Sequence, residues 1–228
     1  MKSLRAFQEE WMNFALKDDD AAPFLAYSPE GYSGHVRRIL YIGKATNKEL
    51  WRDLFDEERP QPAGQRVQNQ LDREKVLFES QRNRTGRSFW GFANTLSHLL
   101  DRSCDDLSNL AWSNLCKVGA KSGVPNQKSI EEQSELSVAT LQQEIREFQP
   151  SVIVVVTRDF AENEILGRVF EPSDSDKWKK SEDEPEKRVD DVWWLESTPA
   201  VLWMRHPRLA PPELLEYAAT KVLQLAGK

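Results

Sequence analysis

The run VIVVV at residues 152–156 constrains the fold more than any other feature of the sequence. Five consecutive β-branched residues between Pro150 and the polar pair Thr157–Arg158 predict a β-strand. This strand is apolar on both faces, as in parallel sheets that helices cover on both sides. The run is also far shorter than the ~20 apolar residues that a membrane-spanning helix needs. We therefore expect a protein built around a central parallel sheet, with no membrane association.

Strand-like and helix-like segments alternate along the chain. Apolar residues recur at helical spacing, and polar residues or prolines stand at the expected ends, in segments 3–16, 88–102, 129–148 and 211–225. Short helices are expected at 49–55 and 162–170, and further strands at 38–43, 110–119, 192–198 and 200–206. Strands joined by helical crossovers predict a three-layer α/β/α sandwich with a mainly parallel central sheet.

Two polar segments fall outside this alternation. RPQPAGQRVQNQ, residues 59–70, has no clear apolar period and is expected to be a loop or an insertion. Residues 171–191 hold nine acidic and five basic side chains, a net charge of −4, and are expected to form a charged surface loop. The chain of 228 residues is otherwise expected to fold as a single domain, 1–228.

Charge and cysteine content exclude several classes of protein. The net charge of −6 argues against a protein that coats nucleic acid nonspecifically, although it leaves room for a local basic groove. Cys104 and Cys116 are too few for a disulfide framework or a four-cysteine metal site, so neither a metal nor another cofactor is expected. The first residues have no signal-peptide pattern, and a cytoplasmic location is expected.

The stretch ILYIGKATN, residues 39–47, leads from a strand into a glycine turn. Gly43-Lys44-Ala45-Thr46 is similar to the end of a phosphate-binding P-loop, but the nearest preceding glycine is Gly34, which is too far away. What the stretch does indicate is a strand end followed by a helix, where open parallel sheets bind ligands. The stretches FWGF (89–92), SNLCKVG (113–119), TRDF (157–160) and MRHPR (204–208) lie at comparable places. Because the carboxyl ends of parallel strands meet at one crevice, we expect these turns to converge.

Taken in order, these stretches resemble the motifs of the uracil-DNA glycosylase superfamily. The resemblance covers residues 38–226 and rests on ILYIGKATN, RSFWGFANTL, WSNLCK, QPSVIVVVT and RHPR. It implies the fold of that superfamily, hydrolysis of the bond between a base and its sugar, and nucleic acid, DNA more than RNA, or a nucleotide as the partner. The resemblance says nothing of protein partners.

Two residues take the main roles that the resemblance implies. His206 would donate a hydrogen bond to the departing base and stabilise its negative charge. Asn114 would read the edge of the base with its paired donor and acceptor. The alternatives are a structural His-Pro turn for His206 and, for Asn114, a side chain that satisfies backbone groups at the strand end.

Other residues are expected to line the same pocket or to contact the nucleic-acid backbone. Trp90 is the expected stacking side chain, whereas Phe89 and Phe92 have the spacing of core residues. Arg82, Arg84, Arg87, Arg205 and Arg208 are candidate phosphate contacts, with solvated surface arginines as the alternative. The residues expected to contact the substrate are Gly43, Lys44, Ala45, Trp90, Asn114, Arg205 and Arg208.

The sequence departs from the superfamily at the position whose side chain orients or activates the attacking water. Active members carry Asp or Asn two residues after the glycine of the first motif, and this chain has Ala45 there. Thr46 and Asn47 are the candidate replacements, and Asp159 is a more distant one. Arg208 also replaces a small residue, and Leu209 is a candidate wedge for opening a duplex. Two alternatives to a glycosylase therefore stay open: a non-catalytic binding module on this fold, and an unrelated pocket for a metabolite or partner protein.

Overall fold

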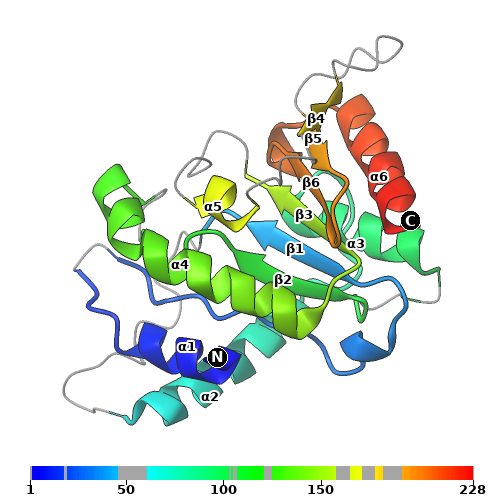
Figure 1. Ribbon diagram of the computed structural model, residues 1–228. Coiled ribbons are helices and arrows are strands. Elements are labelled where there is room, and N and C mark those ends of the chain that lie inside the picture. Colours follow the sequence, from blue (N-terminus) through cyan, green and yellow to red (C-terminus); the bar gives the residue numbers. More distant parts are fainter. Residues whose placement is uncertain are drawn as a thin grey trace.

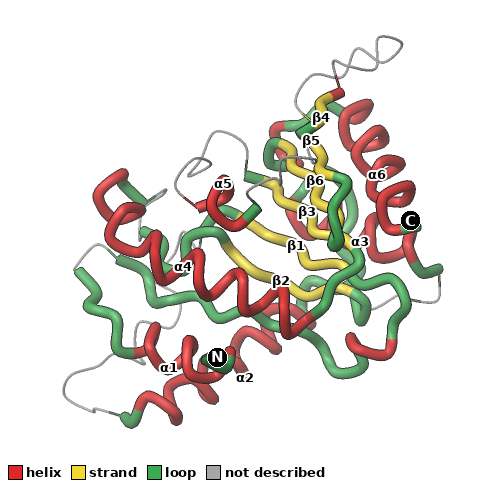
Figure 2. The backbone as a smooth tube through the Cα atoms, viewed as in Figure 1, coloured by secondary structure: helices red, strands yellow, loops and turns green. Residues whose placement is uncertain are grey.

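A six-stranded mixed sheet forms the centre of the protein in the computed structural model (Figures 1 and 2). The structure describes residues 2–17, 20–45, 61–102, 104, 107–120, 125–157, 165–170, 178–181 and 192–227. The strands are β1 (Ile39–Gly43), β2 (Leu110–Asn114), β3 (Val152–Val156), β4 (Lys179–Lys180), β5 (Val192–Leu195) and β6 (Ala200–Met204), in the order β2-β1-β3-β6-β5-β4. The four strands β2, β1, β3 and β6 are parallel, while β5 and β4 extend the sheet in antiparallel fashion.

Helices cover both faces of the parallel part, as the apolar strands predicted. The helices are α1 (Leu4–Met12), α2 (Ala63–Glu79), α3 (Phe89–Leu100), α4 (Gln127–Phe148), the short α5 (Gly167–Val169) and α6 (Pro212–Ala226), with 3₁₀ turns η1 (Tyr32–Gly34) and η5 (Pro207–Leu209). Helices α3 and α6 lie on one face of the sheet, and α4 and α5 lie on the other (Figure 1). The predicted α/β fold with a mainly parallel sheet is thereby confirmed, and the arrangement is compatible with a three-layer sandwich.

The side chains of each strand alternate between two cores. On β1, Ile39 and Tyr41 pack with α3 and α6, whereas Leu40 and Ile42 pack with α4. On β3, all five residues from Val152 to Val156 are fully buried. This double burial is why the strand could be recognised from composition alone, since neither face needs polar residues.

The segment 59–70 is the main correction to the sequence reading. The prediction of a loop or insertion is wrong for most of it, because α2 begins at Ala63 and continues to Glu79. The buried face of α2 includes Gln70 and Glu74 beside Val67 and Phe78, so half of this face is polar. The amide of Gln70 donates to the backbone carbonyl of Pro23 and to Glu74. A helix whose buried stripe is polar has no apolar period for sequence analysis to detect.

The charged segment 171–191 is described only at residues 178–181. Within it, Lys179 and Lys180 form the edge strand β4 and pair with Trp194 and Trp193 of β5, so this part is a strand instead of a surface loop. The short helix expected at 49–55 lies outside the described residues. None of the helices in the described ranges has both the length and the apolarity needed to cross a bilayer.

Candidate functional site

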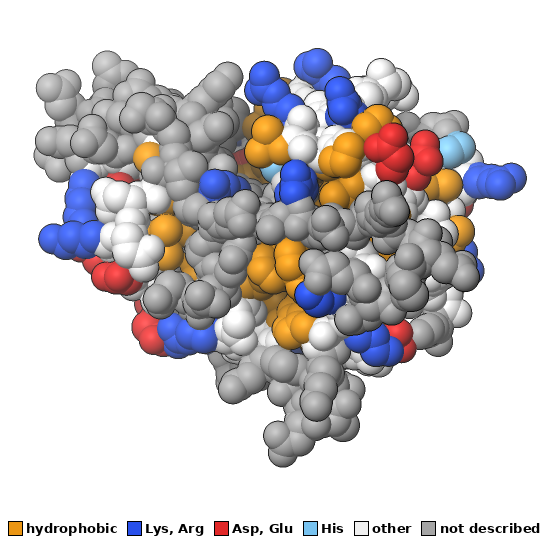
Figure 3. Space-filling view, turned by 90° about the horizontal axis from the view of Figure 1, so that it is seen from above, with side chains coloured by type: hydrophobic (Ala, Val, Ile, Leu, Met, Phe, Trp, Pro, Cys, Tyr) orange, Lys and Arg blue, Asp and Glu red, His pale blue; other side chains and the backbone are white. Residues whose placement is uncertain are grey.

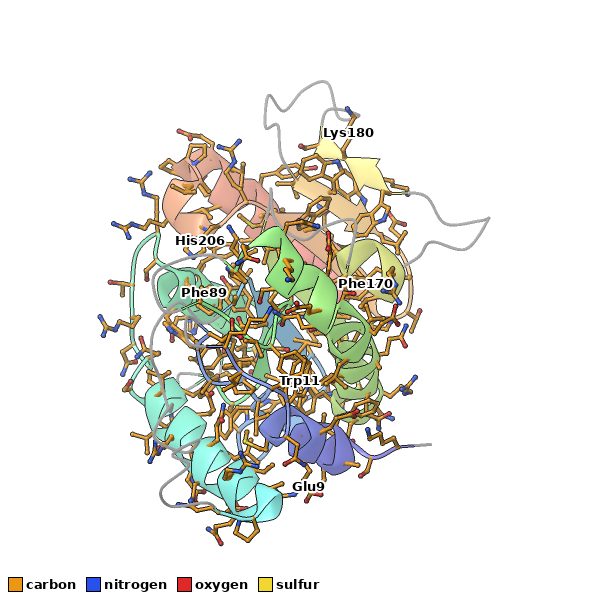
Figure 4. All side chains as sticks on the ribbon, turned by 90° about the vertical axis from the view of Figure 1, so that its left-hand side faces the viewer. Glu9, Trp11, Phe89, Phe170, Lys180 and His206 are labelled. Carbon is orange, nitrogen blue, oxygen red and sulfur yellow. The ribbon has the colours of Figure 1, made fainter. Side chains whose placement is uncertain are left out.

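The strand order places a topological switch point between β1 and β3. The chain leaves β1 towards β2 on one side, and leaves β3 towards β6 on the other. The connection after β1 includes α3 on one face of the sheet, and the connection after β3 includes α5 on the opposite face. Open α/β sheets bind ligands outside the carboxyl ends of such strands. Figure 4 shows this end of the sheet, with the labelled Phe89 and His206 close to one another.

Gly43 and Asn114 end their strands side by side. The two residues are register partners, and pairing continues beyond them through Leu115 N–H to Gly43 C=O and Cys116 N–H to Lys44 C=O, both at 3.0 Å. A Cβ atom on residue 43 would lie 2.6 Å from Asn114 Oδ1 and 3.0 Å from a ring carbon of Phe89. Only glycine leaves room for the Asn114 amide at this position, and this is a packing reason for the glycine of the ILYIGKATN turn.

The Asn114 side chain makes no hydrogen bond within the part of the chain that the structure describes, although it is 97% buried: its exposed fraction is 3%. Asn109, at the other end of the same strand, is different. Its Oδ1 accepts from Ser97 Oγ at 2.6 Å, and its Nδ2 donates to the Ser97 carbonyl at 3.1 Å. Asn109 is thus the structural asparagine of this strand, while neither the donor nor the acceptor of the Asn114 amide is used in the described part of the chain.

His206 lies beside the same aromatic ring. Its imidazole stacks on Phe89, with ring centroids 6.1 Å apart and an interplanar angle of 26°. The backbone N–H of Arg208 donates to His206 Nδ1 at 3.2 Å, which leaves the proton of the neutral ring on Nε2. Burial lowers the pKa of His206, and the charges of Arg208 and Lys44 lower it further. His206 is therefore a neutral hydrogen-bond donor at physiological pH.

Phe89 joins Gly43, Asn114 and His206 into one cluster. The Tyr41 hydroxyl donates to the Phe89 carbonyl at 3.1 Å, and Ser88 caps α3 by accepting from the Gly91 N–H at 2.9 Å. Trp90, the expected stacking residue, instead packs against Phe78 and Trp112, with centroids 5.5 and 4.7 Å away. The geometry thus favours Phe89 over Trp90 as the aromatic surface of the site.

Glycine at position 91 allows the loop before α3 to pack closely against the start of this helix. A Cβ atom there would lie 2.2 Å from the Gly86 carbonyl oxygen, so the loop 80–88 rests directly on the first turn of the helix. This loop exposes Arg82, Arg84 and Arg87 immediately before Phe89. Across the site, Arg208 and Leu209 are also exposed, Leu209 to 72%. In the view of Figure 3, Lys and Arg side chains lie around groups of hydrophobic ones.

The segment after β2 is anchored by a buried ion pair. Lys117 Nζ lies 2.6 Å from Glu144 Oε1 and 2.7 Å from Ser113 Oγ, and Ser113 Oγ donates to Glu144 Oε2 at 2.7 Å. Lys117 and Glu144 are essentially inaccessible to solvent. Burial lowers the Lys117 pKa, and Glu144 acts in the opposite direction. The cluster ties the end of β2, and hence Asn114, to α4.

The structure describes only one of the positions considered for orienting the attacking water, Ala45. Ala45 is half-buried and packs with the core on the α4 side, so its methyl group supplies no polar function. Thr46, Asn47 and Asp159 lie outside the described residues. Thr157, which the sequence reading did not single out, directly follows β3. Its Oγ1 is buried with no hydrogen-bond partner in the described ranges. Its position in the TRDF stretch, at the end of a predicted strand, is the sequence feature that could have pointed to it.

Comparison with known proteins assigns no family. The sequence matches no protein-family model, and no curated protein is significantly similar to it. The functional argument therefore depends on the residues at the strand ends.

Proposed function

We propose that this protein binds a nucleobase of a nucleic-acid strand at the cluster of Gly43, Phe89, Asn114 and His206, as a divergent member of the uracil-DNA glycosylase superfamily. The observation that carries the proposal is the Asn114 amide, which is buried beside Gly43 and Phe89 and makes no hydrogen bond in the described part of the chain. This amide therefore has both an unused donor and an unused acceptor in the described part of the chain. A base edge, with a donor beside an acceptor, satisfies both ends of this amide at once.

Phe89 and His206 supply the other contacts that a base requires. An aromatic ring stacked on a base contributes ~1–3 kcal/mol, and Phe89 is the ring that borders both polar side chains. The Nε2–H of neutral His206 donates to a base carbonyl without adding a charge to the site. If the glycosidic bond breaks, the base departs as an anion, and this hydrogen bond strengthens as the charge develops. His206 would then serve as the catalytic residue by stabilising the leaving group.

The same cluster also supports a second function, binding without excision. This alternative is favoured by Ala45, because a methyl group neither orients a water nor stabilises an oxocarbenium-like sugar. In a hydrolase, the water must be held by another group such as Thr46, Asn47, Asp159 or Thr157. In a binding or sensing protein, none of these is required.

The decisive experiment measures base release and base binding together. Single-turnover assays, with enzyme in excess, use single- and double-stranded oligonucleotides carrying uracil, hypoxanthine, xanthine or a mismatch. Binding is measured in parallel by fluorescence anisotropy, comparing each oligonucleotide with one that has an abasic site at the same position. The variants are His206→Ala and Asn114→Ala, and the matched controls are the exposed His98→Ala on α3 and Asn69→Ala on α2.

The outcomes separate the two functions. Base release that falls at least 100-fold in His206→Ala and persists in His98→Ala supports a glycosylase. Absence of release, with base-dependent binding that weakens about 10-fold or more in Asn114→Ala, supports a binding module. Equal affinity for base-containing and abasic strands, unchanged by Asn114→Ala, would refute both.

A further inference from the structure

A second cluster of chemically active side chains lies at the opposite end of the sheet. His35 precedes β1, Asp101 is the C-cap residue of α3, and Cys104 belongs to the connection from α3 to β2. All three therefore lie near the amino ends of β1 and β2, away from the nucleobase site. We propose that His35, Asp101 and Cys104 bind a divalent transition metal ion of the Zn²⁺ type.

The distances match those of a tetrahedral coordination sphere. His35 Nδ1 lies 3.3 Å from Asp101 Oδ2 and 3.5 Å from Cys104 Sγ, and one ligand atom from each residue lies within 4.8 Å of the others. Around Zn²⁺, bond lengths of about 2.0–2.1 Å to nitrogen, about 2.0–2.2 Å to oxygen and about 2.3 Å to sulfur give tetrahedral edges of about 3.3 Å for N···O and about 3.5 Å for N···S. The N···O and N···S separations therefore match a tetrahedral site, and a rotation of the His35 ring, whose Nε2 now lies 4.0 Å from Sγ, would direct the Nδ1 lone pair between the other two donors.

The arrangement does not fit a catalytic cysteine triad. In such a triad, the thiol and the carboxylate contact different nitrogens of the imidazole, so that one orients the ring and the other exchanges a proton with it. Here both approach the same nitrogen, since Sγ is 3.5 Å from Nδ1 and 4.0 Å from Nε2. The three donor atoms lie within 4.8 Å of one another, which is close enough for them to share one ion.

The surroundings supply features that metal sites require. Cys104 is 3% exposed, whereas the side chains of His35 and Asp101 are 21% and 33% exposed, so the site is partly dry and still open to solvent. Ser108 Oγ donates to Cys104 Sγ at 3.6 Å, an outer contact that stabilises a thiolate. Cys104 also lines a surface pocket together with Asn94, His98 and residues 83–86 of the loop before α3.

This ligand set selects among metals by its chemistry. One thiolate, one imidazole and one carboxylate are donors that Zn²⁺ and Co²⁺ accept, while Mg²⁺ and Ca²⁺ prefer oxygen ligands alone. With three protein ligands, the fourth position is filled by water or another ligand. The ion would cross-link the segment before β1 to the end of α3 and to the connection that leads into β2.

Cobalt substitution tests the proposal directly. The reduced full-length protein is titrated with CoCl₂, and thiolate-to-cobalt charge-transfer absorption is recorded, followed by competition with ZnCl₂. The key variant is Cys104→Ser, and the matched control is Cys116→Ser, the other buried cysteine, which lies beyond the carboxyl end of β2. Thermal unfolding is measured with and without ZnCl₂. At a free concentration 100 times Kd, the ion is expected to raise the Tm by roughly 5–11 °C.

Charge-transfer absorption that is lost in Cys104→Ser and retained in Cys116→Ser supports the site. Absence of the band in the native sequence, or a band that persists in Cys104→Ser, overturns it. If circular dichroism shows that Cys104→Ser does not fold, the proposal is tested with His35→Gln and Asp101→Asn, because both variants retain the thiol. A rise in Kd of at least 10-fold in these variants supports the proposal, and an unchanged Kd refutes it.

Discussion

At the scale of single residues, the protonation state of His206 determines what the candidate site can donate. Its pKa is lowered from the ordinary 6.5 by burial and by the charges of Arg208 and Lys44. Between the lowered pKa and about pH 6.5, the unfolded chain therefore binds more protons than the folded one. The contribution of neutral His206 to stability is full above about pH 6.5 and is lost as the pH falls from there towards the folded-state pKa.

This gives a prediction for NMR titration. The His206 resonance, assigned by comparison with His206→Gln, is expected to titrate below pH 6.5 in the native sequence. Arg208→Ala removes a nearby positive charge and should move the midpoint to higher pH. Arg87→Ala, which removes an exposed arginine from another loop, is the control. An identical midpoint in Arg208→Ala and the native sequence would contradict this account of the shift.

Gly43 gives a steric prediction at the same scale. In Gly43→Ala the new methyl would meet Asn114 Oδ1 and the Phe89 ring, so both side chains must move. We expect base-dependent binding to weaken at least 10-fold and the free energy of unfolding to fall by about 1–3 kcal/mol. The control is Gly64→Ala in α2, where the nearest atom to a new Cβ is 3.5 Å away. Unchanged base binding in Gly43→Ala would show that Asn114 and Phe89 do not form the pocket.

At the scale of elements, the buried Lys117–Glu144 pair holds β2 and α4 together. Lys117→Met leaves the Glu144 carboxylate buried without its counter-charge, which is expected to lower the free energy of unfolding by about 3–5 kcal/mol. The double variant Lys117→Met/Glu144→Gln should recover much of this loss, because no buried charge remains. Urea unfolding measures both. Lys128→Met, at an exposed position of α4, is the control, and equal losses in the single and double variants would contradict the role of the uncompensated charge.

The η5 turn gives a prediction about duplex opening. Leu209 is 72% exposed on this short turn, three residues after His206. A side chain that wedges into a base stack matters only where a stack must be opened. We therefore expect Leu209→Ala to weaken activity or binding on duplex DNA by about 10-fold more than on a single strand. Val76→Ala, another exposed apolar side chain on α2, is the control. Equal losses on both substrates would exclude a wedge.

At the scale of the whole molecule, the net charge of −6 limits how the proposed nucleic-acid ligand could be held. Under the proposed function, the exposed arginines of the loop 80–88 and Arg208 would provide only a few phosphate contacts. The logarithm of the binding constant is therefore expected to fall with the logarithm of salt concentration with a slope of about −2 to −4. Arg84→Ala should reduce this slope by about 0.7–0.9, whereas Arg5→Ala on α1 should not change it. A slope near zero would mean that phosphates are not contacted.

The features that sequence analysis did not reach share one physical cause. The helix α2 was missed because Gln70 and Glu74 occupy its buried face, where their partners come from tertiary contacts. Likewise, Phe89 and Trp90 are neighbours on α3, and only the packing of Phe78 and Trp112 around Trp90 leaves Phe89 beside His206. Counting cysteines could not suggest the proposed metal site, because His35 is 66 residues away from Asp101 and joins it only through the fold.

The sequence by itself determined the layered α/β architecture, the parallel strands and most helix positions, because burial on two faces and helical periodicity are local patterns. It also drew attention to Gly43, Asn114 and His206, because turns at the ends of parallel strands must converge. The tertiary structure decided which of these side chains meet, and that Asn114 has no hydrogen bond in the described ranges while Asn109 is paired with Ser97. These properties depend on distances between residues far apart in the chain, which no local pattern encodes.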